Sequence, residues 1–428
     1  MDQIIKKRAH YRNLFGWLLL FLVLVSLSLN KWRGQPDRVI WSDAEGYYMY
    51  LPAVFIYKGF TGMPLHTPGW PEVDGKTYTK FTCGVAIMQL PFFLAVHGYM
   101  GFIGRPTDGF GQANGLSIIF ASVFYLLAGL FLLYKWVTRY FPGRNLVVGA
   151  LIALTLGTNL YYYAIAEAGM SHIYSFALFA GIVYFTDLLY ANPRRVYFLI
   201  IGLLFGLAVL IRPTAIVLLV LILFYGVRNS AELKERFAFF FRNRAPVAGA
   251  ILGFIVVFIP QMFYWKHTQG QWIVYSYGST EGFDHWAGPK VFQVLGHLEN
   301  GLFLYSPLVV LAFGGMLYLA WRRQLSGHIF LIVLAAATYL FASWWDWNFG
   351  GAFGHRCFVE YYAILALPFA FVLDKMTKIR AGFFRVVCFL IVAFLIWYSL
   401  HMTYAYASPW DGPEWTWELF WGVVGRMW

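Results

Sequence analysis

Long apolar runs recur along nearly the whole chain, and short polar or basic stretches separate them. Each run approaches the roughly 20 residues that a helix needs to cross a bilayer. A transmembrane β-barrel would show shorter segments of alternating hydrophobicity instead. The pattern therefore predicts an all-α polytopic membrane protein with a single membrane domain over residues 1–428.

We expect about eleven transmembrane helices, at residues 14–30, 112–134, 146–163, 172–190, 196–211, 213–227, 247–265, 301–320, 327–345, 358–374 and 382–401. The first run lacks the small-residue cleavage site of a signal peptide, so we expect it to be retained. Lys and Arg concentrate in every second connection, which is the positive-inside pattern. If these basic connections lie inside, the N-terminus is inside and the C-terminus is outside.

One apolar segment, 83–103, does not fit this alternation of inner and outer connections. If it crossed the membrane fully, every basic connection from residue 135 onward would lie outside. We therefore expect a re-entrant segment, or one that lies at the outer interface, since protein-buried backbone is tolerated at depth. Two long outer segments remain, 31–82 and 266–300. Connection 228–244 has the pattern of a basic amphipathic helix on an anionic lipid surface.

The composition argues against several classes of function. The chain is 60% hydrophobic and carries a net charge of +12. Its basic residues are spread over short connections between apolar runs, so we expect no nucleic-acid partner. Cys83, Cys357 and Cys388 are too few and too scattered for a disulfide framework or a metal cage. Cys83 and Cys357 both fall on the outer side, which leaves their pairing open beside unpaired structural roles.

Two carboxylates in the first outer segment, Asp43 and Glu45, are the leading catalytic candidates, with Tyr47 beside them. Acidic groups at a membrane boundary are costly without a partner or a function. A carboxylate there can act as a general base, and partial burial would raise its pKa toward neutrality. Alternatively, these are ordinary loop carboxylates, with Ser42 or Asp43 capping a helix through residues 47–57.

The stretch 161–172 lies at the outer ends of two predicted helices. Three tyrosines are followed there by Glu167 and His172. These two side chains could orient a substrate or bind a metal ion. The alternative is an interfacial aromatic belt with Ser171 as a helix cap.

A second aromatic stretch, 344–356, combines three tryptophans with Asp346, three glycines, His355 and Arg356. Aromatic rings stack on sugar faces, and glycines let the backbone approach a ligand closely. Arg356 can bind a phosphate through two parallel hydrogen bonds. An aromatic belt explains the tryptophans but not the glycine-histidine-arginine run. We therefore predict that Asp346, Trp347, His355 and Arg356 bind substrate.

Two more cations are candidates for substrate binding. Arg212 precedes a proline at an outer helix end, where it either holds the phosphate of a lipid substrate or reaches lipid headgroups. Lys80 is a similar candidate at the start of segment 83–103. Glu281, Asp284 and His285 in the second long outer segment match no strong metal site.

These motifs, in this order, resemble the C-type integral-membrane glycosyltransferase superfamily, including protein O-mannosyltransferase-like and lipid A aminoarabinose transferase-like enzymes. The similarity rests on the acidic stretch 43–48, on 78–85, and on the ordered motifs at 170–172, 210–214, 301–307 and 353–356. It is closest to uncharacterised bacterial members and extends to about residue 375. Relatives often have prolines near Lys80, and this chain lacks them.

The resemblance implies transfer of a sugar from a polyprenyl-phosphate donor to a lipid, glycan or protein acceptor at the outer face of the inner (plasma) membrane. Such enzymes usually invert the anomeric centre in one displacement. Asp43 would be the base, with Glu45 as backup or substrate holder. Arg356 and Arg212 would neutralise the leaving phosphate. Some relatives hold a divalent metal; Asp43 with Glu167 is the pair that would do so here, although we favour metal independence.

A transporter or flippase of a lipid-linked or anionic substrate is the competing hypothesis. It predicts charged groups at the midplane of several helices. In this chain Asp and Glu are nearly absent from the span centres, and polar motifs gather at one predicted face. A membrane scaffold without chemistry would not explain four such motifs. The sequence therefore favours an enzyme.

Overall fold

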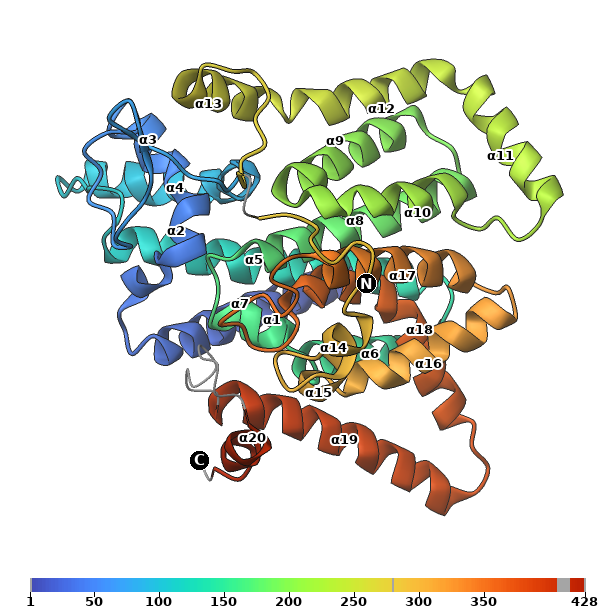
Figure 1. Ribbon diagram of the computed structural model, residues 1–428. Coiled ribbons are helices and arrows are strands. Elements are labelled where there is room, and N and C mark those ends of the chain that lie inside the picture. Colours follow the sequence, from blue (N-terminus) through green and yellow to red (C-terminus); the bar gives the residue numbers. More distant parts are fainter. Residues whose placement is uncertain (1, 279–280, 406–415, 427–428) are drawn as a thin grey trace. The chain divides into compact units, whose positions relative to one another are not determined.

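The computed structural model describes residues 2–278, 281–405 and 416–426. The fold is helical, as predicted, and the strands among these residues are the antiparallel pair β1 (Glu72–Val73) and β2 (Lys76–Thr77) (Figure 1). Among the described residues, six helices are long and apolar enough to cross a membrane, and six shorter apolar helices accompany them. The chain is therefore an integral membrane protein.

The helices fall in the following order. The first nine helices are α1 (Asp2–Lys31), η1 (Pro36–Val39), α2 (Ser42–Tyr48), α3 (Tyr50–Phe55), α4 (Gly84–Phe102), α5 (Gln112–Val137), α6 (Arg144–Leu156), α7 (Leu160–Ile165) and α8 (Ser171–Ala191). They are followed by α9 (Arg195–Ile211), η2 (Pro213–Val217), α10 (Leu218–Phe224), α11 (Ser230–Arg242), α12 (Arg244–Val256) and α13 (Ile259–Gln269). The last are α14 (Val291–Gly296), α15 (Leu302–Tyr305), α16 (Leu308–Trp321), α17 (Gly327–Ser343), η3 (Arg356–Tyr361), α18 (Tyr362–Thr377), α19 (Gly382–Ala405) and α20 (Trp417–Val424).

Each predicted span coincides with helix, but several spans are interrupted. The span predicted at 146–163 is divided into α6 and α7, and the one at 301–320 into α15 and α16. Both interruptions contain polar side chains that bind other segments, as described below. The number of crossings and the orientation of the termini stay predictions. The amphipathic helix expected in 228–244 is α11, which has no buried residue.

Segment 83–103 differs from the expectation. It forms the uninterrupted 19-residue helix α4, with Pro91 inside it. A re-entrant segment is therefore wrong, because a continuous helix cannot reverse its direction. The alternative position at the outer interface stays a prediction. The charge pattern constrains only the number of crossings, and it carries no information on whether an extra apolar segment turns.

The chain divides into two compact units. The N-terminal unit comprises Met1–Ala128 and Tyr163–Tyr174, and the C-terminal unit comprises Gly129–Tyr162 and Ser175–Trp428. The first contains the candidate carboxylates, and the second contains the candidate arginines.

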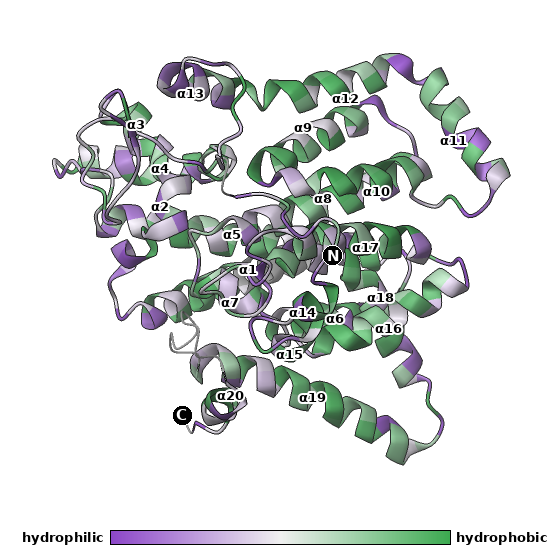
Figure 2. Ribbon diagram, in the orientation of Figure 1, coloured by the Kyte–Doolittle hydropathy of each residue, from purple (hydrophilic) through white to green (hydrophobic). Residues whose placement is uncertain are grey.

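Helices α9 and α12 of the C-terminal unit pack closely side by side (Figure 1). A Cβ on Gly202 would lie 2.1 Å from the carbonyl oxygen of Ala250, and one on Gly206 would lie 2.7 Å from that of Phe254. Small residues that let backbones approach are typical of helix pairs in membranes. Figure 2 shows both helices as mainly hydrophobic, whereas α11 alternates between hydrophilic and hydrophobic residues.

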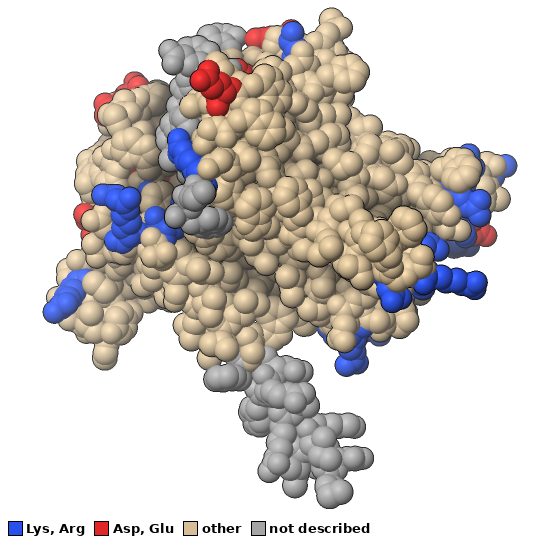
Figure 3. Space-filling view, turned by 90° about the horizontal axis from the view of Figure 1, so that it is seen from below, with Lys and Arg blue, Asp and Glu red and all other residues tan. Residues whose placement is uncertain are grey.

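The surface agrees with a lipid environment. Large apolar side chains are exposed on many helices, among them Phe124, Leu203, Ile255, Leu317 and Phe394. In Figure 3, Lys and Arg lie mainly toward the edges of the face, and wide areas between them carry no Lys, Arg, Asp or Glu. Such apolar surface on a soluble protein would cause aggregation.

Candidate active site

The carboxylate of Glu45 holds the first long segment in place. Glu45 is fully buried in α2, and its Oε1 accepts a hydrogen bond from the backbone N–H of His66 at 2.6 Å. Its Oε2 accepts from the N–H of Thr67 at 2.9 Å and from the indole N–H of Trp70 at 2.8 Å. One buried anion thus orders a loop that follows it by more than twenty residues. Its predicted catalytic role stays untested.

Asp43 lies at the start of the same helix but in a different environment. Its side chain is half-buried, and the preceding residue, Ser42, has a positive φ of 52°. The N–H of Ser42 donates to the hydroxyl of Thr67 at 2.7 Å, which fixes the helix entry. The predicted capping by Ser42 or Asp43 is wrong: the helix already begins at Ser42, and its N-cap is Trp41, without a side-chain hydrogen bond.

Aromatic residues surround the other face of α2. The ring of Tyr47 lies 4.6 Å from that of Phe81. A Cβ on Gly46 would lie 2.4 Å from a ring carbon of Phe81 and 2.6 Å from one of Trp70, so only glycine fits there. The hydroxyl of Thr79 donates to the carbonyl of Gly46 at 3.1 Å. The segment that contains Lys80 therefore packs directly on the acidic helix.

Lys80 is half-buried, with its ammonium 5.7 Å from the centre of the Phe81 ring. Because Phe81 also packs on Tyr47, Lys80 belongs to the same part of the N-terminal unit as Asp43. This neighbourhood was not evident from the sequence, where the two residues are far apart.

The turn before α8 contacts the acidic helix as well. A Cβ on Gly169 would lie 2.5 Å from Cβ of Ala44 and 3.0 Å from the carbonyl oxygen of Val39. Glu167, in the same turn, is half-buried and interacts electrostatically with Lys31. His172 is buried, with its ring 4.8 Å from that of Tyr163 in an edge-on contact. The structure thus brings the turn at Gly169 to the acidic stretch, whereas His172 itself is enclosed.

A metal ion held by protein ligands alone does not fit this site. Among the described residues, no group of three or more His, Cys, Asp or Glu side chains is placed to hold one. Asp43 and Glu167 could offer two carboxylates, and a hard divalent cation held by them would take water or substrate phosphate oxygens as its other ligands.

Arg356 belongs to a charged cluster in the C-terminal unit. Its guanidinium lies 6.0 Å from the centre of the Phe349 ring and interacts with the carboxylate of Asp346. Burial raises the pKa of Asp346, and the positive charge of Arg356 opposes this shift. Glu281 and Glu299 also act electrostatically on Asp346. The cluster presents a half-buried arginine beside several acids.

His355, next to Arg356 in the sequence, is buried. Its Nε2 lies 3.1 Å from the carbonyl oxygen of Trp347, and a carbonyl only accepts, so Nε2 carries the proton. Burial lowers the pKa of His355 to about 3, which keeps the ring neutral. His355 therefore fixes the loop that carries Trp347. Trp347 is half-buried, and its ring meets that of His297 at 5.3 Å.

Asn159 connects three segments that are distant in sequence. Its side-chain amide donates to the carbonyl of Phe353 at 2.9 Å, and its oxygen accepts from the Tyr362 hydroxyl at 2.7 Å. Its backbone N–H donates to the hydroxyl of Ser306 at 3.1 Å. These bonds occupy the interruptions between α6 and α7 and between α15 and α16. The breaks in the predicted spans are therefore polar junctions that position the loop before Arg356.

Arg212 pairs with an acid that sequence reasoning missed. Its Nε lies 3.3 Å from Oε1 of Glu360, whose side chain is almost fully buried, and its Nη2 lies 2.8 Å from Sγ of Cys357. Glu360 stands four residues after Arg356, at the start of a predicted span. That unusual position was the available signal. Cys83, Cys357 and Cys388 all lie among the described residues, and none forms a disulfide.

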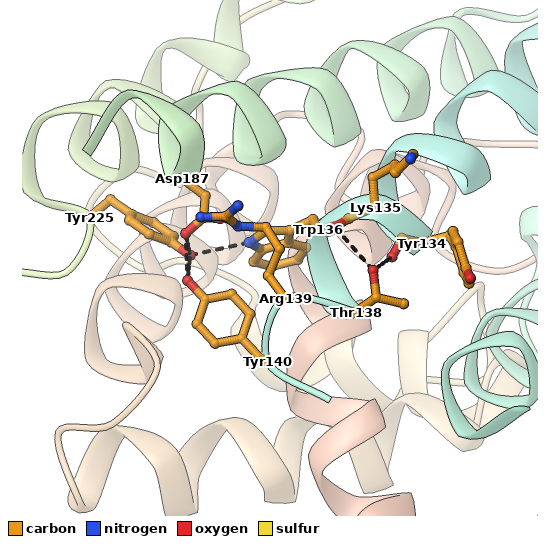
Figure 4. Close-up of polar contacts among 8 residues, drawn as sticks. All are labelled: Tyr134, Lys135, Trp136, Thr138, Arg139, Tyr140, Asp187 and Tyr225. Carbon is orange, nitrogen blue, oxygen red and sulfur yellow. Dashed lines mark hydrogen bonds and ion pairs between the residues drawn. The ribbon is translucent and has the colours of Figure 1, made fainter. Parts of the chain in front are cut away.

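A second missed polar cluster is drawn in Figure 4. Asp187, within α8, forms an ion pair with Arg139 and accepts hydrogen bonds from the hydroxyls of Tyr140 and Tyr225. The indole N–H of Trp136 donates to Tyr225 at 3.1 Å. This cluster joins the ends of α5, α8 and α10 on the side of the basic connections. Asp187 lies near the end of a predicted span, and its partners Arg139 and Tyr225 are distant in sequence, so this cluster could not be recognised from the sequence.

Comparison with known proteins gives the relationships of the chain. Residues 107–265 match the family described as dolichyl-phosphate-mannose-protein mannosyltransferase. A search of curated proteins gave no match. Among solved structures, ArnT from Cupriavidus metallidurans bound to undecaprenyl phosphate is similar with a TM-score of 0.53 and 14% identity, over 91% of this chain and 65% of that one.

Two structures of the Archaeoglobus fulgidus oligosaccharyltransferase are also similar. AglB with an inhibitory peptide and a dolichol-phosphate has a TM-score of 0.51 at 13% identity, over 91% of this chain. The apo form has a TM-score of 0.50 at 15% identity, over 90% of this chain. This chain covers 55% of the length of each. The resemblance inferred from the motifs is confirmed: the chain has the fold of the C-type integral-membrane glycosyltransferases.

Proposed function

We propose that the protein transfers a sugar from a polyprenyl-phosphate donor to an acceptor at the outer face of the inner membrane. The observation that supports this proposal is that the two carboxylates of α2 lie in different environments. One carboxylate, Glu45, is buried and engaged by three donors, whereas the other, Asp43, is half-buried on the same rigid support. Such support holds a reactive group in a fixed geometry.

We assign the base to Asp43 because its side chain is only half-buried and a substrate can reach it, whereas the side chain of Glu45 is fully buried. A base must accept a proton, and both oxygens of Glu45 already accept hydrogen bonds from N–H groups. A proton placed there would face donors and cost a hydrogen bond. The acceptor hydroxyl would lose its proton to Asp43 as its oxygen bonds to the anomeric carbon. The bond from that carbon to the phosphate oxygen breaks, and polyprenyl phosphate leaves with the electron pair.

The leaving phosphate gains negative charge, and arginines stabilise such charge. Arg356 is the first candidate because it is half-buried and lies next to Asp346. Arg212 is already held by Glu360 and Cys357, so it supports the site electrostatically and positions the loop at Arg356. Trp347 and Asp346 would contact the sugar, and Lys80, Glu167 and His172 would shape the region around Asp43.

The structural relatives support the proposed donor class. One is described as bound to undecaprenyl phosphate, and another as a complex with a dolichol-phosphate and an inhibitory peptide. Both of these lipids are polyprenyl phosphates. The positive-inside pattern supports a position of the candidate residues on the outer side, which would be the periplasm or cell exterior.

The test is sugar transfer in membranes that contain the full chain. Membranes with and without the protein would be incubated with radiolabelled polyprenyl-phosphate sugars, and label in lipid, glycan and protein fractions would be counted. We expect protein-dependent transfer from at least one donor. In Arg356→Ala the donor KM should rise or kcat should fall, while Arg105→Ala, an exposed arginine of another connection, should behave as wild type. Absence of transfer from every lipid-linked donor would contradict the proposal.

A further inference from the structure

An open groove on the side of the basic connections is outside the proposed active site. It lies in the C-terminal unit along α17, between α10 with the start of α11 and the end of α16. Its volume is about 850 Å³. Apolar side chains form its floor and walls, including Val220, Phe224, Leu317, Trp321 and Ile332. A groove of this size accommodates much of a lipid chain pair or a comparable apolar ligand.

Two arginines from different connections form one end of this groove. Arg228 follows α10, and Arg323 follows α16. The guanidinium Nη1 of Arg323 donates to the backbone carbonyl of Arg228 at 3.0 Å, so the two residues are held together. Both side chains are exposed. Arg228 also forms an exposed ion pair with Glu232 at 3.3 Å, which leaves a net positive charge at this end of the groove.

The walls at this end are fixed by hydrogen bonds. His328 Nε2 lies 2.6 Å from the carbonyl oxygen of Val227, and the N–H of Gly226 donates to the hydroxyl of Ser326 at 3.0 Å. Arg236 of α11 donates to the carbonyl of Tyr225 at 2.7 Å, at the end of α10. The arginine pair therefore sits on a support that does not have to form when a ligand binds, which lowers the entropic cost of binding.

We propose that this groove is a binding site for an anionic phospholipid of the surrounding leaflet. The phosphate lies between Arg228 and Arg323, and the acyl chains lie along the apolar floor. Basic pockets between membrane helices on the side of the basic connections suit anionic headgroups. Trp321 is 76% exposed at the end of α16, and tryptophan at such a position is typical of the headgroup level.

The positive charge at the arginine end of the groove favours an anionic lipid over a neutral one. A zwitterionic lipid would gain the same apolar contacts but little net attraction to the arginines. Each basic group near an anionic lipid contributes roughly fivefold in affinity. Because Glu232 offsets one of the two arginines, the net positive charge at this end of the groove gives a preference of about fivefold. We therefore expect selectivity for headgroup charge, whereas an apolar groove alone would bind both lipids equally.

The test uses the purified full chain after removal of native lipid in detergent. Native mass spectrometry would count bound dioleoyl phosphatidylglycerol and dioleoyl phosphatidylcholine, two lipids with identical chains. We expect wild type to prefer the anionic lipid about fivefold. The double variant Arg228→Gln/Arg323→Gln should lose most of this preference and retain binding of the neutral lipid. The matched control, Arg194→Gln/Arg195→Gln, removes two exposed arginines from another basic connection and should retain it.

A second variant tests the apolar part of the site. Ile332→Trp places a larger ring on the groove wall and should weaken binding of both lipids without changing their ratio. Unfolding temperatures in lipid-free detergent verify that each variant is folded. Equal binding of the two lipids to wild type would overturn the proposal even without any variant. An equal loss of preference in the control pair would also overturn it, because the effect would then reflect general surface charge.

Discussion

Replacing Glu45 by Gln would show how the acidic helix is held. The carboxylate accepts three hydrogen bonds from the N–H groups of His66, Thr67 and Trp70. Glutamine is nearly isosteric, and its oxygen can take the place of Oε2 and keep two of these donors. Its NH₂ group would then face the N–H of His66, so that bond is lost.

The expected loss of stability in Glu45→Gln follows from the burial of this side chain. Hydrogen bonds to a charged group contribute about 1.5–3 kcal/mol each, and Glu45 is fully buried. Losing one such bond and the charge that strengthens the other two should cost about 2–4 kcal/mol of stability. The loop at His66 and Thr67 should also open more often, since its backbone is tied to this carboxylate.

The assay combines thermal unfolding of the purified chain with hydrogen exchange of the amides of residues 66 and 67. We expect Glu45→Gln to lower the unfolding temperature and to speed exchange at both amides. The control, Glu72→Gln, changes an exposed glutamate in the same segment and should change neither. Unchanged exchange at residues 66 and 67 in Glu45→Gln would refute the structural role of Glu45.

Three further outcomes are expected from the same purified protein. Gly46→Ala should destabilise it by about 1–3 kcal/mol through overlap with the neighbouring aromatic rings, whereas Gly98→Ala, whose Cβ meets nothing within 4 Å, should not. Asn159→Ala should cost about 2–4 kcal/mol because it leaves the buried hydroxyl of Tyr362 without its 2.7 Å partner, and chemical unfolding would measure this loss. His355 has a folded-state pKa of about 3, so its unfolded form binds the extra proton below pH 6.5. Stability should therefore fall as the pH drops from 6.5 toward 3, and His355→Phe should flatten this slope in melting curves measured at several pH values.

The hydrophobic pattern predicted most helices because membrane spans depend on length and composition, which are local. It did not predict the breaks beside Asn159 and Ser306, since polar junctions depend on partners far away in the sequence. The re-entrant segment was wrong for a related reason. The alternation of basic connections limits the number of crossings. The continuity of helix α4 depends instead on local backbone structure.

The roles of the candidate site residues stay predictions, and the pairings of these residues could not be predicted from the sequence. The acidic stretch and Arg356 stand out because charged groups at a membrane boundary are costly. The different environments of Asp43 and Glu45 could not be inferred, because the donors to Glu45 lie more than twenty residues later. The position of Glu360 at the start of a predicted span marked it as unusual, but its partner Arg212 lies almost 150 residues earlier, so the ion pair could not be inferred from the sequence.

The central claim is that Asp43 takes the proton from the acceptor while Glu45 orders the helix around it. The most direct measurement is kcat for sugar transfer by Asp43→Asn, together with donor affinity and unfolding temperature. General base catalysis contributes about 10²–10⁴-fold, so kcat should fall by at least about a hundredfold, with donor affinity and stability close to wild type. A folded Asp43→Asn protein that transfers sugar within about threefold of the wild-type rate would contradict the account, since a base worth at least a hundredfold cannot be removed at so small a cost.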